Sequence, residues 1–357
     1  MNIRDFRQAE FADIFVNSNR RSILNLCPRF GKIRTSINIL NKINPKSILI
    51  AYPDKKIMTS WKNEFVEMGF DDHNVTYTTY LSLKKYDGIT YDIMIFDEIH
   101  LMSRAQIETA KLLMKLNKCL LGLTGTLSSF TQETLLNELK LPVIAIYPIA
   151  QAIAEGVITD YEITVVKVPL DSIARQYKGK SEKFKFDALT RRINYLENQE
   201  KNTMFLRLER MRIIQNSVAK LNKTKELLKE YANERVLVFC GITKIADNLG
   251  IPSHHSKSLG KELFNAFATG DYNVNHLAVC KIGNTGVTYK PLNRVIINYF
   301  DSNGENLAQK ILRCMSFEFD NPDKKANIII VSSTEPTETK WLIRALEFFD
   351  KTKIKYL

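Results

Sequence analysis

The sequence predicts an α/β protein made of two doubly wound parallel sheets in tandem. Short apolar runs of strand length alternate with amphipathic segments of helix length, which is the pattern of a parallel sheet covered by helices on both faces. This pattern occurs in both halves of the chain. With 357 residues, the chain is also too long for one ordinary core and suits about two domains.

In the first half, five apolar runs predict strands, and the segments between them include three predicted helices. Parallel sheets bind ligands at the carboxyl ends of their strands, so the residues that follow these runs are the candidates for chemistry. The predicted strands are Ser22–Cys27, Ser47–Tyr52, Val75–Tyr77, Ile93–Phe96 and Leu120–Leu123, and the predicted helices are Ile33–Leu40, Lys55–Met68 and Gln106–Leu116.

The second half repeats this style after a long charged segment. Residues 171–232 have mostly a helical pattern, and the Lys-rich stretch 178–185 within them is either a solvated loop, which we favour, or part of a nucleic-acid surface. We expect a first domain at 1–160, a largely helical connection at 161–233 that begins the second domain, and the rest of that domain at 234–357. Its predicted elements are the strands Val236–Cys240, His276–Cys280, Val295–Tyr299 and Asn327–Val331 and the helix Glu262–Ala268.

Composition narrows the class of protein and of partner. Lys and Arg outnumber Asp and Glu by 51 to 39, which favours nucleic acid as a partner, although many proteins without such a partner are also basic. No run approaches the roughly 18 uncharged apolar residues of a membrane span, and the first ten residues resemble no signal peptide. The five scattered cysteines predict neither a disulfide framework nor a zinc site. We therefore expect a cytoplasmic protein, and a monomer.

Two short stretches carry the chemistry. Cys27 to Lys32 (CPRFGK) lies between a predicted strand and a predicted helix, where backbone N–H groups and a lysine can hold a phosphate. Asp97 and Glu98 stand where the apolar run 93–96 stops. In a phosphate-loop enzyme the first carboxylate holds Mg²⁺, usually through water, and the second orients or deprotonates the attacking water. Each stretch alone also suits an ordinary turn, but together they predict a nucleotide site.

With these motifs in this order, the chain resembles the superfamily 2 helicases and translocases of the DExH kind. The resemblance covers nearly the whole chain and implies two domains like the core of the recombinase RecA, with ATP, Mg²⁺ and nucleic acid bound at the cleft between them. It implies an ATP-dependent DNA helicase or translocase that acts on single-stranded or branched DNA, with RNA as an alternative. The Lys-, Ile- and Asn-rich composition indicates an AT-rich genome such as that of a phage, and then a host cytoplasm.

The resemblance also assigns roles to residues. It implies that Gln8 reads adenine and that Asp97 holds Mg²⁺ while Glu98 is catalytic, together with Gln309 and Arg313. Gln309 would lie near His100, and Arg313 would reach the phosphates. The remaining implied residues are Pro28, Arg29, Phe30, Gly31, Lys32 and Gly286 for the nucleotide, Pro53, Thr79 and Thr285 for the nucleic-acid backbone, and His100, Thr124 and Thr126 for coupling.

Three positions depart from the family pattern. Ile33 replaces the hydroxyl residue that normally binds Mg²⁺ after the lysine, and Thr35 lies about 200° further around the predicted helix. Ser316 stands where a second arginine is usual, and Thr288 where an acid or Asn is usual. We therefore expect slow ATP hydrolysis. The alternative is a non-hydrolysing, helicase-like module that binds nucleic acid or protein.

Other residues leave alternatives open. Trp61 suits either base stacking or packing of its helix against the sheet, and Tyr52 and Tyr80 carry the same alternatives. Cys27 lies beside the phosphate loop, but a small packed residue is favoured over a nucleophile because no partner histidine is evident. His254 and His255 have no further ligands at metal-site spacing, so a loop that contacts nucleic acid is favoured over a metal site.

Overall fold

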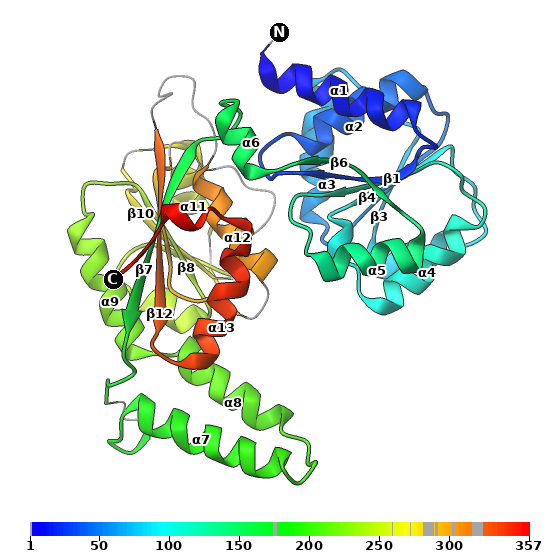
Figure 1. Ribbon diagram of the computed structural model, residues 1–357. Helices are drawn as coiled ribbons and strands as arrows, with labels where there is room; N and C mark the ends of the chain where they lie inside the picture. The colour runs from blue at the N-terminus through cyan, green and yellow to red at the C-terminus, as the bar shows by residue number, and fades with distance from the viewer. Residues whose placement is uncertain are drawn as a thin grey trace. The chain divides into compact units, whose positions relative to one another are not determined.

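The computed structural model describes residues 2–173, 177–258, 260–271, 273–280, 289, 292–301, 304–315 and 324–357. The chain divides into two compact units, Met1–Ile158 and Thr159–Leu357. Each unit contains one parallel sheet with helices packed on it (Figure 1). The predicted α/β class with two doubly wound parallel sheets is confirmed.

The described residues of the first unit form a six-stranded sheet in the order β3-β2-β4-β5-β1-β6. Helices α1 and α2 pack together on one face, while α4 and α5 lie on the other (Figure 1). The strands are β1 (Arg21–Leu26), β2 (Ile48–Tyr52), β3 (Val75–Thr79), β4 (Ile93–Asp97), β5 (Leu120–Thr124) and β6 (Val143–Tyr147). The helices are α1 (Ile3–Asn17), α2 (Lys32–Ile43), α3 (Lys56–Glu67), α4 (Arg104–Met114), α5 (Ser129–Leu139) and α6 (Ile149–Ala154), with the 3₁₀ turns η1 (Tyr80–Tyr86) and η2 (Ile99–Leu101).

Three neighbouring strands of this sheet, β2, β4 and β5, end at the same edge. Strands β2, β4 and β5 are buried along their whole length, as expected for strands covered on both faces. Their register aligns Ala51 with Phe96, and Asp97 with Leu123. The carboxyl ends of β2, β4 and β5 therefore reach one edge together, and the residues that follow them meet there.

The described residues of the second unit form a seven-stranded sheet in the order β13-β7-β12-β11-β8-β10-β9. Its strands are β7 (Asp160–Val168), β8 (Val236–Cys240), β9 (Ser253–His254), β10 (His276–Cys280), β11 (Arg294–Ile297), β12 (Lys325–Ser333) and β13 (Ile354–Tyr356). Its helices are α7 (Glu182–Glu197), α8 (Met204–Gln215), α9 (Val218–Glu230), α10 (Thr243–Asp247), α11 (Glu262–Thr269), α12 (Gly304–Ile311) and α13 (Pro336–Ala345), with η4 (Leu312–Cys314), η5 (Leu346–Phe348) and η6 (Lys351–Lys353).

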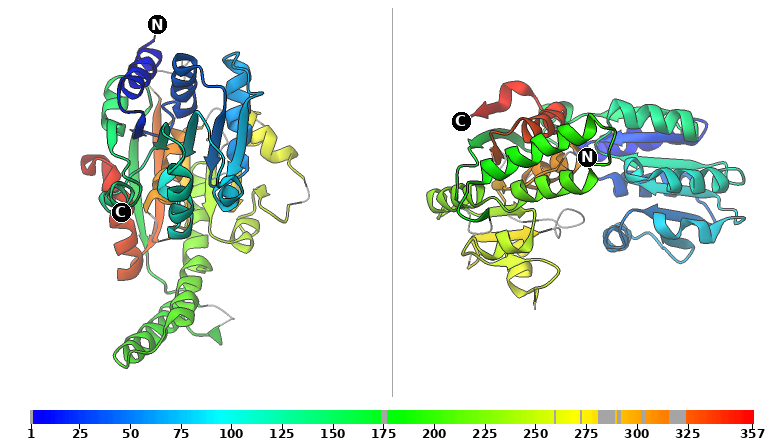
Figure 2. Two further views of the ribbon diagram at one scale, coloured as in Figure 1. Left: turned by 90° about the vertical axis from the view of Figure 1, so that its right-hand side faces the viewer. Right: turned by 90° about the horizontal axis from the view of Figure 1, so that it is seen from below.

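The predicted connection 161–233 contributes β7 and the helices α7 to α9 to this second unit. Helices α7 and α8 form an antiparallel pair that extends from the sheet of this unit (Figures 1 and 2). The expected loop 178–185 is wrong in its last four residues, which form the first turn of α7. The reason is a helix cap, since the Ser181 side chain accepts a hydrogen bond from the backbone N–H of Phe184.

Candidate functional site

The phosphate-loop candidate has the backbone of an anion site. The loop leaves β1, and Arg29 and Gly31 both take positive φ angles, of 70° and 102°. Helix α2 then begins at Lys32, and its N-cap, Gly31, makes no side-chain capping bond. The N–H groups of the first helical turn are therefore left to other partners, and an anion at a helix N-terminus is a favourable one.

Two neighbours fix the shape of this loop. Gln8, on α1, is buried and donates a hydrogen bond from Nε2 to the Phe30 carbonyl over 2.8 Å. A Cβ on Gly31 would lie 2.4 Å from the same Nε2, so a side chain there would displace the Gln8 amide, and the φ angle of 102° itself favours glycine. Gly125 approaches from the other side, because a Cβ there would lie 2.9 Å from Pro28 Cγ and 3.0 Å from Lys32 Nζ. The loop is thus held between α1 and the end of β5.

Lys32 and Glu98 meet at the centre of the site. Lys32 Nζ lies 2.7 Å from Glu98 Oε1, and both side chains are mostly buried, with exposed fractions of 13% and 18%. Burial opposes the charge on Lys32, but Glu98 and Asp97 outweigh it and raise the pKa of the ammonium group. The motif lysine and the motif carboxylates, which are far apart in sequence, therefore form one cluster.

Asp97 is the last residue of β4 and is held on two sides by aromatic side chains. The Trp61 indole Nε1–H donates to Asp97 Oδ2 over 2.9 Å, and the Tyr80 hydroxyl donates to the Asp97 backbone carbonyl over 2.5 Å. Among the described residues, no group donates to the buried Oδ1. Burial and the neighbouring Glu98 raise the pKa of Asp97 to about 6, against the opposing effects of Lys32 and the Trp61 bond.

This arrangement fits the predicted Mg²⁺ ligand at Asp97 and fails to supply a second one after Lys32. A buried carboxylate oxygen without a hydrogen-bond donor suits a hard cation or its bound water. Ile33 has no hydroxyl, and the Thr35 hydroxyl donates to the Gly31 carbonyl over 3.2 Å. The geometry thus agrees with the sequence argument that Thr35 is a poor substitute.

Glu98 stands on an unusual backbone. Its φ and ψ are 51° and 49°, which is the left-handed region that non-glycine residues rarely adopt. This turn directs the Glu98 side chain back to Lys32, while Asp97 points toward Trp61. The two adjacent carboxylates therefore have separate partners.

The three predicted coupling residues lie together behind the carboxylates. His100 Nδ1 is 2.8 Å from Thr124 Oγ1, which is in turn 3.0 Å from the Thr126 carbonyl oxygen. All three residues are buried. Burial lowers the pKa of His100 to about 4, so its imidazole is neutral at physiological pH. The end of β5 and the turn after β4 thus form one hydrogen-bonded unit.

The structure places the other predicted residues in different surroundings. Pro53 directly follows β2, and Thr79 is the last residue of β3. Because the parallel register pairs Tyr52 with Thr79, the carboxyl ends of these two strands lie side by side. In the second unit, Gln309 lies on α12 and Arg313 in the buried turn η4. Thr285, Gly286, Thr288 and Ser316 lie outside the described residues.

The alternatives left open for the three aromatic residues and for Cys27 are resolved in favour of packing. Trp61, Tyr52 and Tyr80 are all buried, so none of these rings is free to stack on a base. Burial raises the pKa of the Cys27 thiol to about 12, which opposes a nucleophilic role. His254 lies in strand β9 and not in the expected loop, with its ring tilted against that of Phe264, and His255 Nε2 lies 2.9 Å from Asp247 Oδ1. The described residues contain no cluster suited to a metal.

Trp61, Tyr80 and Gly125 are members of the site that were not predicted as such from the sequence. Each contacts a motif residue through tertiary packing. A partial signal existed for Gly125, which lies between two threonines already selected. For Trp61 the signal was that a buried indole N–H needs an acceptor.

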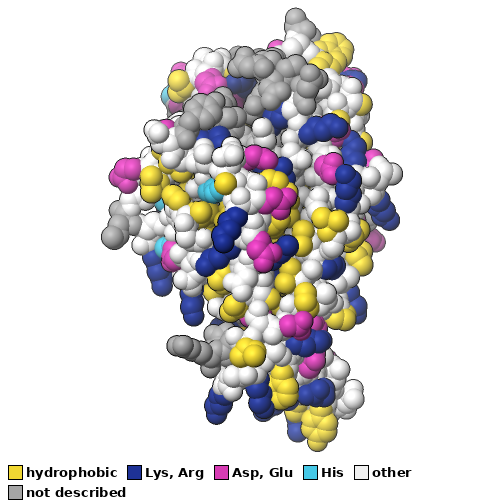
Figure 3. All heavy atoms as spheres, turned by 90° about the vertical axis from the view of Figure 1, so that its left-hand side faces the viewer, with side chains coloured by type: hydrophobic (Ala, Val, Ile, Leu, Met, Phe, Trp, Pro, Cys, Tyr) yellow, Lys and Arg dark blue, Asp and Glu magenta, His cyan; other side chains and the backbone are white. Residues whose placement is uncertain are grey.

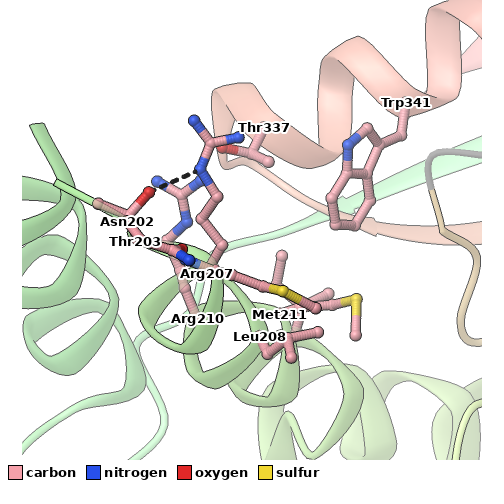
Figure 4. A pocket seen from close by; sticks show the side chains of 10 residues that line it. Asn202, Thr203, Arg207, Leu208, Arg210, Met211, Thr337 and Trp341 are labelled. Atoms are coloured by element: carbon pink, nitrogen blue, oxygen red, sulfur yellow. Dashed lines mark hydrogen bonds between the residues drawn. The ribbon is translucent and has the colours of Figure 1, made fainter. Parts of the chain in front are cut away.

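The second unit contains a cavity of about 590 Å³ between α8 and α13 (Figure 4). Its apolar wall includes Leu208, Met211 and Trp341. Arg207 lies at its edge, but its guanidinium binds Glu197 within the α7–α8 pair. The described lining residues include none of the predicted site residues, so this cavity is separate from the motif cluster.

The surface of the second unit mixes charges with apolar groups. One face shows Lys and Arg side chains interspersed with Asp and Glu, and apolar side chains at the end where α7 and α8 lie (Figure 3). Exposed apolar residues there include Phe184, Tyr195 and Phe205. Among the described residues, no helix has the length and apolar character needed to cross a membrane.

Comparisons with known proteins place this geometry in context. No family model matches the chain. The DNA 3'-5' translocase XPB2 of Sulfurisphaera tokodaii is 26% identical over 310 residues, which cover 76% of this chain and 69% of the relative.

Two solved structures share the fold. The ATP-dependent Type ISP restriction-modification enzyme LlaBIII bound to DNA is 16% identical with a TM-score of 0.63, and the match covers 100% of this chain and 31% of that enzyme. The Hef helicase domain of Pyrococcus furiosus is 13% identical with a TM-score of 0.55, covering 96% of this chain and 99% of that domain. This chain thus spans about a third of the restriction enzyme.

Proposed function

We propose that this chain, which belongs to the superfamily 2 helicases and translocases, is an ATP-dependent motor that binds the backbone of DNA and couples ATP hydrolysis to translocation, unwinding or remodelling. The observation that supports this most strongly is the cluster of Lys32, Asp97 and Glu98 at the ends of β1 and β4. These are the groups that bind phosphate, bind a divalent cation and activate water in phosphate-loop enzymes.

The proposal assigns a role to each of the motif residues of the first unit named below. The α2 N-terminus and Lys32 bind the nucleotide phosphates, which requires Lys32 to exchange its bond with Glu98 for one with phosphate. Glu98 is then released to accept a proton from the attacking water. Asp97 would hold Mg²⁺, which neutralises phosphate charge and stabilises the transition state when bound. Gln8, next to the loop, is proposed to read the adenine.

The nucleic-acid and coupling roles extend this proposal. Pro53, Thr79 and Thr285 are proposed to contact the backbone, which makes binding tolerant of sequence and sensitive to salt. His100, Thr124 and Thr126 would link the nucleotide state to strand grip. Gln309, Arg313 and Gly286 keep the roles that the family resemblance implies. DNA is the favoured substrate because the curated relative is a DNA translocase, with RNA as the alternative.

One observation favours a second candidate, a helicase-like module that binds nucleic acid without hydrolysing ATP. Ile33 offers no hydroxyl to Mg²⁺, and Thr35 is engaged within α2.

Steady-state phosphate release, with and without single-stranded DNA or RNA, separates the two candidates. The motor predicts release that rises with nucleic acid and is abolished by Lys32→Ala. Lys42→Ala is the matched control, because Lys42 lies near the end of the same helix in an exposed ion pair with Asp13. If wild-type release does not exceed that of Lys32→Ala under any condition, the motor proposal is wrong.

The coupling proposal has its own test. His100→Ala should retain nucleotide binding and lose strand displacement, because the bond between His100 and Thr124 connects two motifs. Displacement is measured on forked DNA beside nucleotide binding. Unchanged displacement would contradict the role of His100.

A further inference from the structure

We propose that Trp61 and Tyr80 are positioning residues that hold Asp97 in the orientation that Mg²⁺ requires and connect it to the two segments that contact the nucleic-acid backbone. This inference rests on the proposed function, since it takes Asp97 as the magnesium-binding carboxylate. It adds a role at the magnesium site for two residues and a route by which nucleic acid stimulates hydrolysis.

Trp61 determines which oxygen of Asp97 faces the metal. The indole is fully buried, and its Nε1–H donates to Oδ2 over 2.9 Å. Phe65 packs against it, with ring centroids 5.7 Å apart. An indole N–H can only donate, so it fixes the carboxylate without competing as a metal ligand. Oδ2 is thereby occupied, and Oδ1 is the oxygen left for a cation or its water.

Tyr80 acts on the neighbouring peptide. Its buried hydroxyl donates to the Asp97 carbonyl, which belongs to the peptide group joining Asp97 to Glu98. The orientation of that peptide group governs the left-handed turn at Glu98. Tyr80 therefore stabilises the backbone that sends Asp97 and Glu98 to different partners.

Both residues come from segments that contain proposed nucleic-acid contacts. Trp61 lies on α3, which follows β2 and Pro53, and Tyr80 directly follows Thr79. Strands β2 and β3 pair in parallel, and β2 also pairs with β4, which ends at Asp97. If bound nucleic acid displaces α3, the Trp61 hydrogen bond would therefore transmit this movement to Asp97. If it displaces η1, the Tyr80 hydrogen bond would do so. This route lies within one unit.

The first experiment removes each donor while keeping the ring, as Trp61→Phe and Tyr80→Phe. Trp341→Phe and Tyr52→Phe are the matched controls, because Trp341 lies in the second unit and Tyr52 is a buried tyrosine on β2. For each protein we would titrate Mg²⁺ against ATP hydrolysis and against binding of a fluorescent ATP analogue. Circular dichroism melting reports the fold.

Trp61→Phe should require about 10-fold more Mg²⁺ for half-maximal binding and hydrolysis, the usual effect of losing a partner that orients a metal ligand. Metal-free binding of the analogue should not change. Tyr80→Phe should reduce the stimulation by single-stranded DNA more than basal hydrolysis. Both controls should keep wild-type Mg²⁺ dependence. A packing role alone would lower the melting temperature and leave the Mg²⁺ midpoint in place.

A second readout does not require hydrolysis. Trp61 and Trp341 are the two tryptophans of the chain, so Trp61 is the only one left in Trp341→Phe. Its emission should change as Mg²⁺ is added with a non-hydrolysable ATP analogue, whereas the emission of Trp61→Phe should not. This measurement decides the matter even if Trp61→Phe folds poorly.

The outcomes separate this inference from the proposed function. The positioning role is overturned if folded Trp61→Phe keeps the wild-type Mg²⁺ midpoint, or if Trp61 emission in Trp341→Phe does not change when Mg²⁺ is added. Hydrolysis by the wild-type protein would in that case still support the motor proposal. A wild-type protein with neither Mg²⁺-dependent nucleotide binding nor hydrolysis would overturn both.

Discussion

Each unit of the chain contains a lysine that is at least largely buried and paired with a glutamate, and the two pairs have different surroundings. Lys32 and Glu98 in the first unit are 2.7 Å apart, with exposed fractions of 13% and 18%. Lys220 and Glu338 in the second are 2.6 Å apart, with exposed fractions of 1% and 0%. The chemistry of the pair is the same, so the difference must come from the neighbours.

The pair in the second unit belongs to a closed network. Glu338 also accepts a hydrogen bond from the Ser333 backbone N–H, and Lys220 lies 5.5 Å from the ring centre of Phe300. The pair in the first unit lies beside Asp97 Oδ1, which accepts no hydrogen bond from the described residues. A fully satisfied buried network stabilises one fold, whereas an incomplete one at a strand end can bind a ligand. The following changes test this contrast.

Glu98→Gln should have the largest effect. Loss of a general base typically slows a reaction by about 10² to 10⁴, and we expect that loss in nucleic-acid-stimulated phosphate release. Thermal stability should fall, but by less than in Lys220→Met, because the Lys32–Glu98 pair is more exposed than the Lys220–Glu338 pair and Asp97 remains to stabilise the Lys32 charge. Glu108→Gln, at an exposed position on α4, is the control. If Glu98→Gln lowers the melting temperature but leaves turnover at the level of Glu108→Gln, Glu98 has a structural role and is not the general base.

Lys220→Met should mainly reduce the free energy of unfolding, in contrast to Glu98→Gln, which should mainly reduce turnover. Removing one partner of a buried ion pair leaves an uncompensated charge and costs about 3–5 kcal/mol. Chemical denaturation should detect this loss in unfolding free energy, and the double variant Lys220→Met/Glu338→Leu should recover much of it. Lys223→Met, on the exposed side of the same helix, serves for comparison. A Lys220→Met protein as stable as wild type would remove the contrast between the pairs.

His100 should make stability depend on pH. Burial lowers its pKa from 6.5 to about 4, so the unfolded chain takes up a proton first as the pH falls. The stability that neutral His100 contributes near pH 7 is therefore lost between about pH 6.5 and 4. From pH 7 to pH 5, wild type should lose about 2 kcal/mol more unfolding free energy than His100→Gln. Parallel losses in the two proteins would show that His100 takes up a proton as readily in the folded chain as in the unfolded chain.

Ile33→Thr should have the smallest effect. It restores the hydroxyl at the start of α2, and we expect hydrolysis to rise by less than about 10-fold, with half-saturation at lower Mg²⁺. Ile33→Val, which has a similar shape and no hydroxyl, is the matched control. If both variants match wild type, the metal is held entirely by other groups.

The sequence predicted the elements of the first sheet well because their patterns are strong. Strands β2, β4 and β5 are continuous apolar runs, and the motif residues follow β1, β4 and β5 directly. The rule that chemistry lies at carboxyl ends of parallel strands therefore sufficed to bring Lys32 and Glu98 together.

Other parts depended on tertiary packing. Strand β7 alternates polar and apolar residues at the start of the predicted helical connection and is fixed by pairing with β12 and β13. The bonds from Trp61 and Tyr80 to Asp97 join residues from three segments. Sequence spacing contains no signal for such contacts, because they depend on how α3 and η1 pack against β4.

The left-handed backbone at Glu98 has a consequence for protein engineering. Most residues with a Cβ are disfavoured there by roughly 1–2 kcal/mol, whereas glycine, and among the other residues asparagine, adopt this conformation more readily. A search for heat-tolerant variants guided by stability alone would therefore select replacements at Glu98 that discard the proposed catalytic carboxylate. A chain that retains glutamate at this position would do so at the expense of thermal tolerance. Screens of this protein should accordingly score turnover beside melting temperature.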